Sequence, residues 1–219
     1  MEENGAVLVQ TENGLALKDD ELLIVGDFNK LSKRLKPSNL ETELIVKACK
    51  GKEGRTGLTV VDATAGLGED SFILAAAGFR VKLYERDEII FKLLKDAYER
   101  ALDDPKLSLY AGRMVLFNED SINALKNSIG EADIVYLDPM FPERKKSSLV
   151  KKKFQLIHRL EAPCDDEEEL FNAAKASKPF KIVVKRPLKG EVLAGQKPSY
   201  SLNGKAIRMD VYVFAENKR

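Results

Sequence analysis

The stretch LTVVDATAGLGEDSFILAAAGFRVKLYER, residues 58–86, decides the fold class of this chain. It begins with residues typical of a buried strand, and the small residues and two glycines that follow, Gly66 and Gly68, are typical of a tight turn. A helical pattern then ends at Gly78, and a second strand runs to Arg86. The stretch therefore predicts a strand, a glycine turn, a helix and a second strand, which is the order found in parallel α/β sheets.

The same alternation continues toward the C-terminus. The strongest helical pattern lies at 87–102, and a long, mostly helical region is expected at roughly 148–178. Further strands are predicted at 113–120, 132–139 and 180–187. The segment 197–217 is typical of a hairpin with Asn203-Gly204 as its turn. We therefore expect an α/β fold with a mostly parallel sheet, helices on both faces and an antiparallel edge strand.

The N-terminal part of the chain follows a different pattern. Residues 1–28 are predicted to form a small β element with a turn that ends at Gly14, and the pattern becomes helical from Asn29, with Asn39 as a cap. We therefore divide the chain into 1–50, a small N-terminal β element with a linking helix, and 51–219, the main α/β domain.

The composition excludes several kinds of site. The chain has 36 Lys and Arg against 35 Asp and Glu, so any surface that attracts nucleic acid has to be local. Cys49 and Cys164 are far apart without CxxC spacing and suggest neither a disulfide framework nor a zinc site, and the single His158 excludes a multi-histidine metal site. The N-terminal residues lack the basic and apolar regions of a signal peptide, so none is expected, and no apolar run approaches the length of a membrane span. We expect a cytoplasmic protein without a metal.

The glycine turn predicts a nucleoside ligand. Glu85 follows Gly66 by 85 − 66 = 19 residues, a spacing that lets its carboxylate accept hydrogen bonds from ribose hydroxyls. A dinucleotide fingerprint would have a third glycine where this chain has Ser71, and the acids Glu69 and Asp70 at the helix start would repel a pyrophosphate. They suit S-adenosylmethionine (SAM), which has a sulfonium and an amino group but no phosphate. A nicotinamide cofactor and a turn without ligand remain alternatives. The predicted cofactor residues of this turn and the next strand are Asp62, Gly66, Gly68, Glu69, Asp70 and Glu85.

The third predicted strand also ends in polar residues. Asp120 is placed to accept a hydrogen bond from the amino group of an adenine. Ser121 either contacts the ligand or caps the helix that follows, and these two roles are compatible.

The stretch VYLDPMFPERKK, residues 135–146, ends the fourth predicted strand at the same edge of the sheet. An exocyclic amine of a base is a poor nucleophile, and Asp138 together with the backbone carbonyl of Pro139 could accept hydrogen bonds from it and aim its lone pair. Phe141 could stack on the base, which has to be extruded or already unpaired. The pattern resembles the Asp/Asn-Pro-Pro-Tyr/Phe motif of amino methyltransferases, with Met140 in place of the second proline. By itself this motif leaves the substrate class open.

Positive charge gathers directly after this motif. Six cations fall within ten residues, namely Arg144, Lys145, Lys146, Lys151, Lys152 and Lys153. Beside a base-binding pocket they would contact phosphates, although such a run is also typical of a solvated surface. Lys185 and Arg186 end a further strand at the same edge and could add phosphate contacts.

The strings DATAGLGEDSFILAAAGFRV, ER, YLDPMFPERKKSSLVKK and VVKRP together resemble the RsmJ-type 16S rRNA guanine-N2 methyltransferases over roughly residues 58–214. The resemblance implies a Rossmann-like class I methyltransferase fold with a seven-stranded sheet, SAM as methyl donor, and N2 of a guanine in small-subunit rRNA as acceptor. It also implies cofactor contacts at Glu69, Asp70, Glu85, Arg86, Asp120, Ser121 and Asp138. The chain departs from better-known members, which have Arg-Asp at Glu69-Asp70 and Ser-Ser at Asp120-Ser121.

The leading hypothesis is an enzyme that methylates a guanine N2 of 16S rRNA, free or in the small ribosomal subunit. One alternative is a SAM-dependent N-methyltransferase acting on another RNA, on DNA or on a protein amide. Another is a non-catalytic RNA-binding module, in which Asp138 would be only a turn residue.

Overall fold

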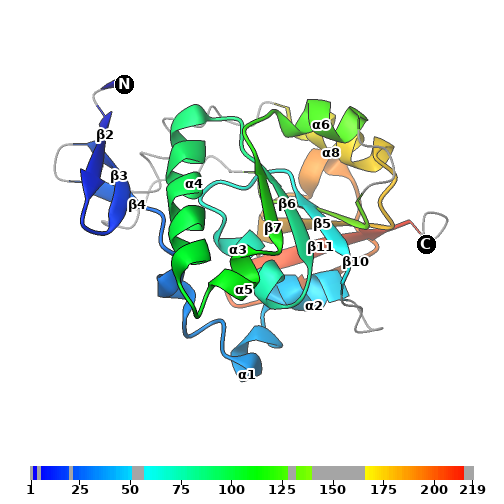
Figure 1. The fold of residues 1–219 in the computed structure, drawn as a ribbon. Helices are drawn as coiled ribbons and strands as arrows, with labels where there is room; N and C mark the ends of the chain where they lie inside the picture. Colours follow the sequence, from blue (N-terminus) through cyan, green and yellow to red (C-terminus); the bar gives the residue numbers. More distant parts are fainter. Residues whose placement is uncertain are drawn as a thin grey trace.

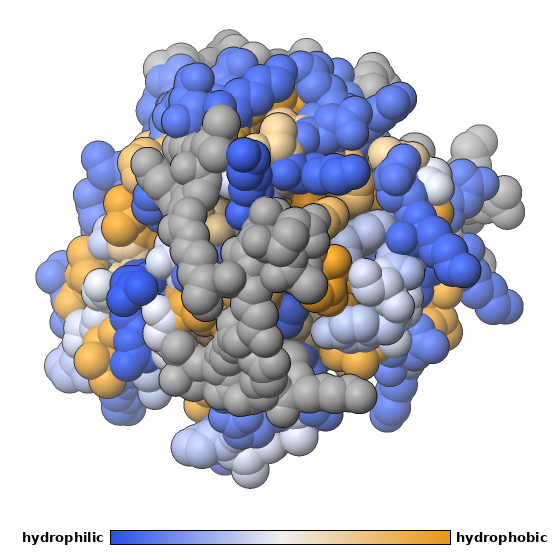
Figure 2. Space-filling model, turned by 90° about the vertical axis from the view of Figure 1, so that its right-hand side faces the viewer, coloured by the Kyte–Doolittle hydropathy of each residue, from blue (hydrophilic) through white to orange (hydrophobic). Residues whose placement is uncertain are grey.

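The computed structural model describes residues 2–3, 6–19, 22–50, 57–127, 132–139 and 166–214. A seven-stranded sheet forms its centre, with helices on both faces and a small N-terminal sheet at one side (Figure 1). On the face shown in Figure 2, hydrophilic side chains predominate and hydrophobic ones appear in small separate areas. Among the described residues, no helix has the length and apolar character that a bilayer span requires.

The large sheet has the strand order β10-β11-β9-β8-β5-β6-β7. The strands are β5 (Thr59–Asp62), β6 (Arg80–Tyr84), β7 (Met114–Phe117), β8 (Ile134–Leu137), β9 (Lys181–Pro187), β10 (Tyr200–Asn203) and β11 (Ile207–Val213). From β7 through β9 every neighbouring pair is parallel, whereas β11 is antiparallel to both β9 and β10. The predicted Rossmann-like sheet, mostly parallel and seven-stranded, is therefore confirmed.

The C-terminal hairpin differs in detail from the prediction. Its second strand, β11, inserts between β10 and β9, so the reversed strand lies one position inside the sheet and β10 forms the edge. Asn203 is still paired with Arg208 at the end of the hairpin ladder, and the N–H of Gly204 donates to the carbonyl of Ile207 over 2.8 Å. The turn is therefore longer than the predicted two residues at Asn203-Gly204.

Successive residues of the central strands face opposite helix layers. On β5, Val60 packs in the cluster that contains α2 (Leu44–Lys50) and α3 (Glu69–Ala76), whereas Val61 packs in the cluster that contains α8 (Glu167–Ala176). Strands that are buried on both faces read as continuous apolar runs, which is the pattern that identified them in the sequence. The described residues contribute three further helices to these layers, namely α4 (Glu88–Asp103), α5 (Ser108–Ala111) and α6 (Ser121–Asn127). Figure 1 shows α6 and α8 together on one side of the sheet.

The N-terminal β element is confirmed as a four-stranded antiparallel sheet. Its strands are β1 (Glu2–Glu3), β2 (Ala6–Thr11), β3 (Gly14–Asp19) and β4 (Leu22–Val25), in that spatial order. Leu17 and Ile24 pack on Ile89 and Leu93 of α4. Helix α4 therefore lies between the small sheet and the large one (Figure 1).

The predicted helical segment before the main domain is broken into three pieces. These are the 3-10 helix η1 (Phe28–Leu31), α1 (Pro37–Leu40) and α2. Pro37 has no N–H and forces Lys36 into an extended conformation with ψ 135°, so one continuous helix cannot form. The predicted cap at Asn39 is wrong, because Asn39 lies inside α1 and its side chain donates to the carbonyl of Lys33 over 2.8 Å.

Helix α2 is held against the large sheet by a buried lysine. Nζ of Lys181 on β9 donates to the carbonyls of Ala48 and Cys49, each over 2.9 Å, at the C-terminal end of α2. A cation there complements the helix dipole and satisfies carbonyls that have no partner within the helix. Residues 44–50 thus pack with the main domain, and the division at residue 50 stays a prediction from sequence.

We predict that Phe28→Ala destabilises the protein by about 3–5 kcal/mol, because it leaves a cavity in the core. The ring of Phe28 is 2% exposed and stacks on Phe72 of α3 with centroids 4.2 Å apart. Urea unfolding measures the loss, and Phe28→Leu, which retains most of the volume, should lose less. Equal stability of Phe28→Ala and the wild-type protein would contradict this packing.

Candidate cofactor and active site

A cavity of about 580 Å³ lies at the carboxyl ends of the parallel strands, where α3 begins. This is the edge at which open α/β sheets bind ligands. Its lining includes every predicted cofactor residue, and Pro139 as well. Those residues are Asp62, Gly66, Gly68, Glu69, Asp70, Glu85, Arg86, Asp120, Ser121 and Asp138. The ends of β5, β6, β7 and β8 thus bring together residues that are up to 77 positions apart in the sequence, from Asp62 to Pro139.

Asp62 at the end of β5 shapes the glycine turn. One carboxylate oxygen accepts from the N–H of Thr64 over 3.1 Å, and the other accepts from Oγ of Ser71 over 2.6 Å. Gly66 and Gly68 have φ of 52° and 75°, a region that favours glycine. A Cβ on Gly68 would lie 2.6 Å from Cδ1 of Leu94. Burial raises the pKa of Asp62 to about 7, although its two hydrogen bonds oppose the shift.

Glu85, directly after β6, ties the second strand end to this turn. One carboxylate oxygen accepts from the N–H of Gly66 over 2.9 Å, and the other accepts from the N–H of Asp87 over 2.8 Å. Burial raises the pKa of Glu85 despite these two bonds. The carboxylate lines the cavity, and its predicted contact with ribose hydroxyls stays a prediction.

The residues after β7 also reach the cavity. Oδ1 of Asp120 accepts from the N–H groups of Ile122 over 2.8 Å and of Asn123 over 3.1 Å, so Asp120 rather than Ser121 caps α6. Oδ2 of Asp120 lies 4.0 Å from Nη1 of Arg86. Asp120 can therefore cap the helix with one oxygen and face a ligand with the other.

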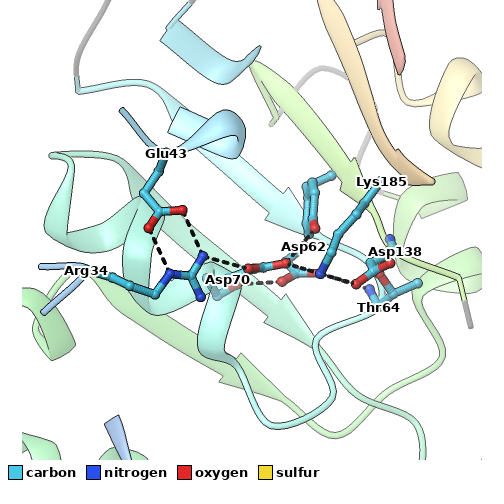
Figure 3. Close-up of polar contacts among 9 residues, drawn as sticks. Arg34, Glu43, Asp62, Thr64, Asp70, Asp138 and Lys185 are labelled. Atoms are coloured by element: carbon cyan, nitrogen blue, oxygen red, sulfur yellow. Dashed lines mark hydrogen bonds and ion pairs between the residues drawn. The ribbon is translucent and has the colours of Figure 1, made fainter. Parts of the chain in front are cut away.

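Lys185 on β9 joins two carboxylates of the cavity (Figure 3). Its Nζ lies 2.8 Å from Oδ2 of Asp70 and 2.8 Å from Oδ2 of Asp138. The hydroxyl of Tyr136 also donates to Oδ2 of Asp70, over 2.7 Å, and the N–H of Asp138 donates to Oγ1 of Thr64, over 2.7 Å. Lys185 was predicted to contact phosphates; its ammonium is bound by two pocket carboxylates, and the phosphate contact stays a prediction.

Burial and the shared cation act in opposite directions on the two acids. Burial raises the pKa of Asp138, and the Lys185 ammonium only partly offsets this. Burial would also raise the pKa of Asp70, but Lys185 and the hydrogen bond from Tyr136 hold that pKa below its usual value. For Lys185 the two carboxylates outweigh burial and raise the pKa of the ammonium, which therefore stays charged.

Arg186 lies on the opposite side of β9 from Lys185. Its guanidinium is buried, with Nη1 3.1 Å from Oε1 of Glu167, and its Nε donates to the carbonyl of Glu191 over 2.7 Å. Successive residues of a strand face opposite sides of the sheet, so the two neighbours cannot share a ligand. Arg186 is thus held by groups within the protein, and its predicted phosphate contact stays a prediction.

Two cavity residues, Arg34 and Glu43, were missed by the sequence analysis. Arg34 and Glu43 form a two-bond ion pair, with Nε–Oε1 and Nη2–Oε2 both 2.8 Å (Figure 3). Nη2 of Arg34 lies 4.0 Å from Oδ1 of Asp70. These two residues precede the first strand of the large sheet, so no strand-end pattern pointed to them.

Several predicted residues lie outside the described parts of the chain. They are Phe141, Arg144, Lys145, Lys146, Lys151, Lys152 and Lys153. Their roles in stacking on a base and in binding phosphates stay predictions. Within the described ranges, no group of three or more His, Cys, Asp or Glu side chains is arranged to hold a metal ion.

Comparison with known proteins gives consistent matches. A family model described as "Putative SAM-dependent methyltransferase" matches residues 1–214. Ribosomal RNA small subunit methyltransferase J of Neisseria meningitidis serogroup C is 39% identical over 216 residues, which cover 96% of this chain and 85% of that protein. The protein of the same name from Pseudoalteromonas atlantica is 40% identical over 222 residues, covering 96% and 86%. A crystal structure of a SAM-dependent methyltransferase from Neisseria gonorrhoeae is 35% identical with a TM-score of 0.77, covering 97% of this chain and 84% of that one. These matches favour SAM over a nicotinamide cofactor.

We predict that Asp62→Asn changes how stability depends on pH. The pKa of Asp62 rises from 3.8 to about 7 on burial, so ionisation of this carboxyl costs the folded state stability as the pH rises through that range. Relative to the wild-type protein, Asp62→Asn should gain at least about 1 kcal/mol between about pH 5 and about pH 8. Urea unfolding at both pH values measures this, with Asp103→Asn on the exposed end of α4 as control. A difference that does not change with pH would contradict the prediction.

We predict that Lys185→Met raises the pKa of Asp70 and of Asp138, because burial remains while the cation is lost. Carboxyl-carbon NMR titrations of the two aspartates measure both values, and Lys185→Arg, which keeps the charge, should leave them closer to those of the wild-type protein. The loss of the shared cation should also destabilise the fold by about 1–3 kcal/mol, because two partly buried carboxylates lose a hydrogen-bond donor. Unchanged titrations in Lys185→Met would show that the ammonium does not control these acids.

Proposed function

Since this chain belongs to the SAM-dependent methyltransferase family of the ribosomal RNA small subunit methyltransferases J, we propose that it transfers a methyl group from SAM to the exocyclic N2 of a guanine in 16S rRNA. The observation that carries the proposal is the position of Asp138. Its carboxylate ends β8 in the same cavity as the glycine turn of residues 66–68. The carboxylate proposed to hold the accepting base and the glycine turn proposed to bind the nucleoside of SAM therefore line the same cavity.

The charge of the cavity fits SAM. Nine carboxylates and three cations line it among the described residues, so it favours a ligand that carries positive charge. Gly68 keeps the turn tight, because a Cβ there would lie 2.6 Å from Cδ1 of Leu94. Glu85 and Asp120 stand at the neighbouring strand ends, where the ribose and adenine of a nucleoside would be bound.

SAM supplies the electrophilic methyl group, and the chain's own residues prepare the nitrogen that accepts it. Oδ2 of Asp138 is bound to Lys185, whereas Oδ1 accepts no hydrogen bond from any described residue. In the proposed reaction that oxygen accepts a hydrogen bond from the NH₂ of a guanine, and the carbonyl of Pro139 is the second acceptor. Lys185 favours the ionised form of Asp138, against the burial that raises its pKa. Holding the two reactants in line would account for much of the remaining rate enhancement.

The rest of the proposed substrate site rests on residues outside the described ranges. Phe141 would stack on the extruded base, and the cluster Arg144–Lys146 with Lys151–Lys153 would bind RNA phosphates. Such a site fits 16S rRNA, free or within the small ribosomal subunit. An enzyme with this substrate would work in the cytoplasm.

We predict that the wild-type protein transfers radiolabelled methyl from SAM to small subunits or 16S rRNA that lack the modification. After digestion, the label should appear in N2-methylguanosine. Asp138→Ala should lower the rate at least about 100-fold, because both acceptor geometry and positioning are lost. Its affinity for the cofactor, measured by calorimetry, should fall only modestly.

Glu99→Ala removes an exposed carboxylate of α4 outside the cavity and serves as the control. Cofactor binding with label in another nucleoside, or with no label, would refute the guanine assignment. A loss of cofactor affinity in Asp138→Ala as large as the loss of rate would make Asp138 mainly a cofactor ligand.

A further inference from the structure

The ion pair of Arg34 and Glu43 enters the cavity from a segment that precedes the large sheet. The guanidinium points toward Asp70 at the start of α3, as Figure 3 shows. Glu43 binds Nε and Nη2 of Arg34, and Nη1 has no hydrogen bond with any described residue. The side chain of Arg34 is 41% exposed, so a ligand can reach it.

A SAM molecule brings one negative group, the α-carboxylate of its amino-acid end, into a cavity rich in acids. That carboxylate requires a cation or several N–H donors, because bringing it next to other carboxylates without them is unfavourable. The cavity offers three cations among the described residues, Arg34, Arg86 and Lys185.

Two of the three cations, Lys185 and Arg86, already lie between pairs of carboxylates in other parts of the cavity. The ammonium of Lys185 already bridges two carboxylates at 2.8 Å each. Arg86 follows Glu85 at the end of β6, and its Nη1 lies 3.7 Å from Asp166 and 4.0 Å from Asp120. That places Arg86 at the end of the cavity where the nucleoside is expected.

The orientation of the ligand leads to Arg34. If ribose and adenine lie at the ends of β6 and β7, and the accepting base lies at Asp138, the amino-acid end points to the remaining side of the cavity. There Arg34 lies 4.0 Å from Asp70. Glu43 fixes the plane of the guanidinium in advance, so little side-chain entropy is lost when a carboxylate binds its remaining N–H groups.

We propose that Arg34, oriented by Glu43, binds the α-carboxylate of SAM, so that the segment before the large sheet completes the cofactor site. This assignment rests on the proposed use of SAM and adds a residue that selects the amino-acid end of the cofactor. Arg34 acts on binding and selectivity, and Glu43 is a positioning residue.

The test compares ligands that differ at the amino-acid end. S-adenosylhomocysteine has the carboxylate, whereas 5′-methylthioadenosine lacks the whole amino-acid end. By calorimetry, Arg34→Met should weaken binding of S-adenosylhomocysteine by about 10- to 100-fold, as expected for the loss of a charge-assisted hydrogen bond. It should change binding of 5′-methylthioadenosine by less than about twofold, and Glu43→Gln should show a smaller effect of the same kind.

Decarboxylated SAM separates the carboxylate from the ammonium. The wild-type protein should prefer SAM to the decarboxylated compound, because the Arg34 guanidinium attracts the carboxylate of SAM and repels the ammonium. Arg34→Met removes the guanidinium and should lose this preference. Arg86→Met, at the other end of the cavity, should weaken all of these ligands alike. Thermal melting of each variant confirms that it is folded.

Each remaining outcome is informative. Equal weakening of S-adenosylhomocysteine and 5′-methylthioadenosine by Arg34→Met would make Arg34 a structural residue of the cavity and overturn the assignment. No weakening of either would place the carboxylate on other groups, with the same consequence. If the wild-type protein bound none of these ligands, the proposed function itself would fail, and the assignment with it.

Discussion

The carboxylates of Asp70 and Asp138 share the ammonium of Lys185, and the arrangement of the cavity depends on this shared cation. The three side chains come from α3, from the end of β8 and from β9, which are far apart in sequence. Two acids this close would repel each other, and one would take up a proton, if no cation stood between them. Lys185 therefore fixes the distance between the carboxylates at the start of α3 and at the end of β8.

The same principle extends across the whole site. From Glu43 through Arg34, Asp70 and Lys185 to Asp138, charges alternate in sign, and neighbouring charged groups lie between 2.8 and 4.0 Å apart. Alternation lets many ionised groups occupy one cavity, because each is next to an opposite charge. A cofactor with both a cationic and an anionic end can join this arrangement without leaving either end unpaired.

Sequence reasoning worked where the backbone decides the position of a side chain. Asp62, Glu85 and Asp138 lie at or directly after the ends of recognisable parallel strands. Such strands end at one edge of a sheet, so the meeting of these side chains could be predicted. Lys185 and Arg186 could not be separated in this way, because a shift of one residue in the strand exchanges their faces. Arg34 and Glu43 lie among short helices broken at Pro37, and only tertiary packing brings them to the cavity.

The buried contact between Lys181 and the end of α2 has a consequence for anyone who wishes to cut the chain. A fragment that begins at residue 51, the boundary suggested by the sequence pattern, would start after α2 and leave the ammonium of Lys181 inside the protein without the two carbonyls that now accept from it. It would also lack Arg34 and Glu43. A fragment that keeps these contacts and the full lining of the cavity therefore has to start well before the first strand of the large sheet.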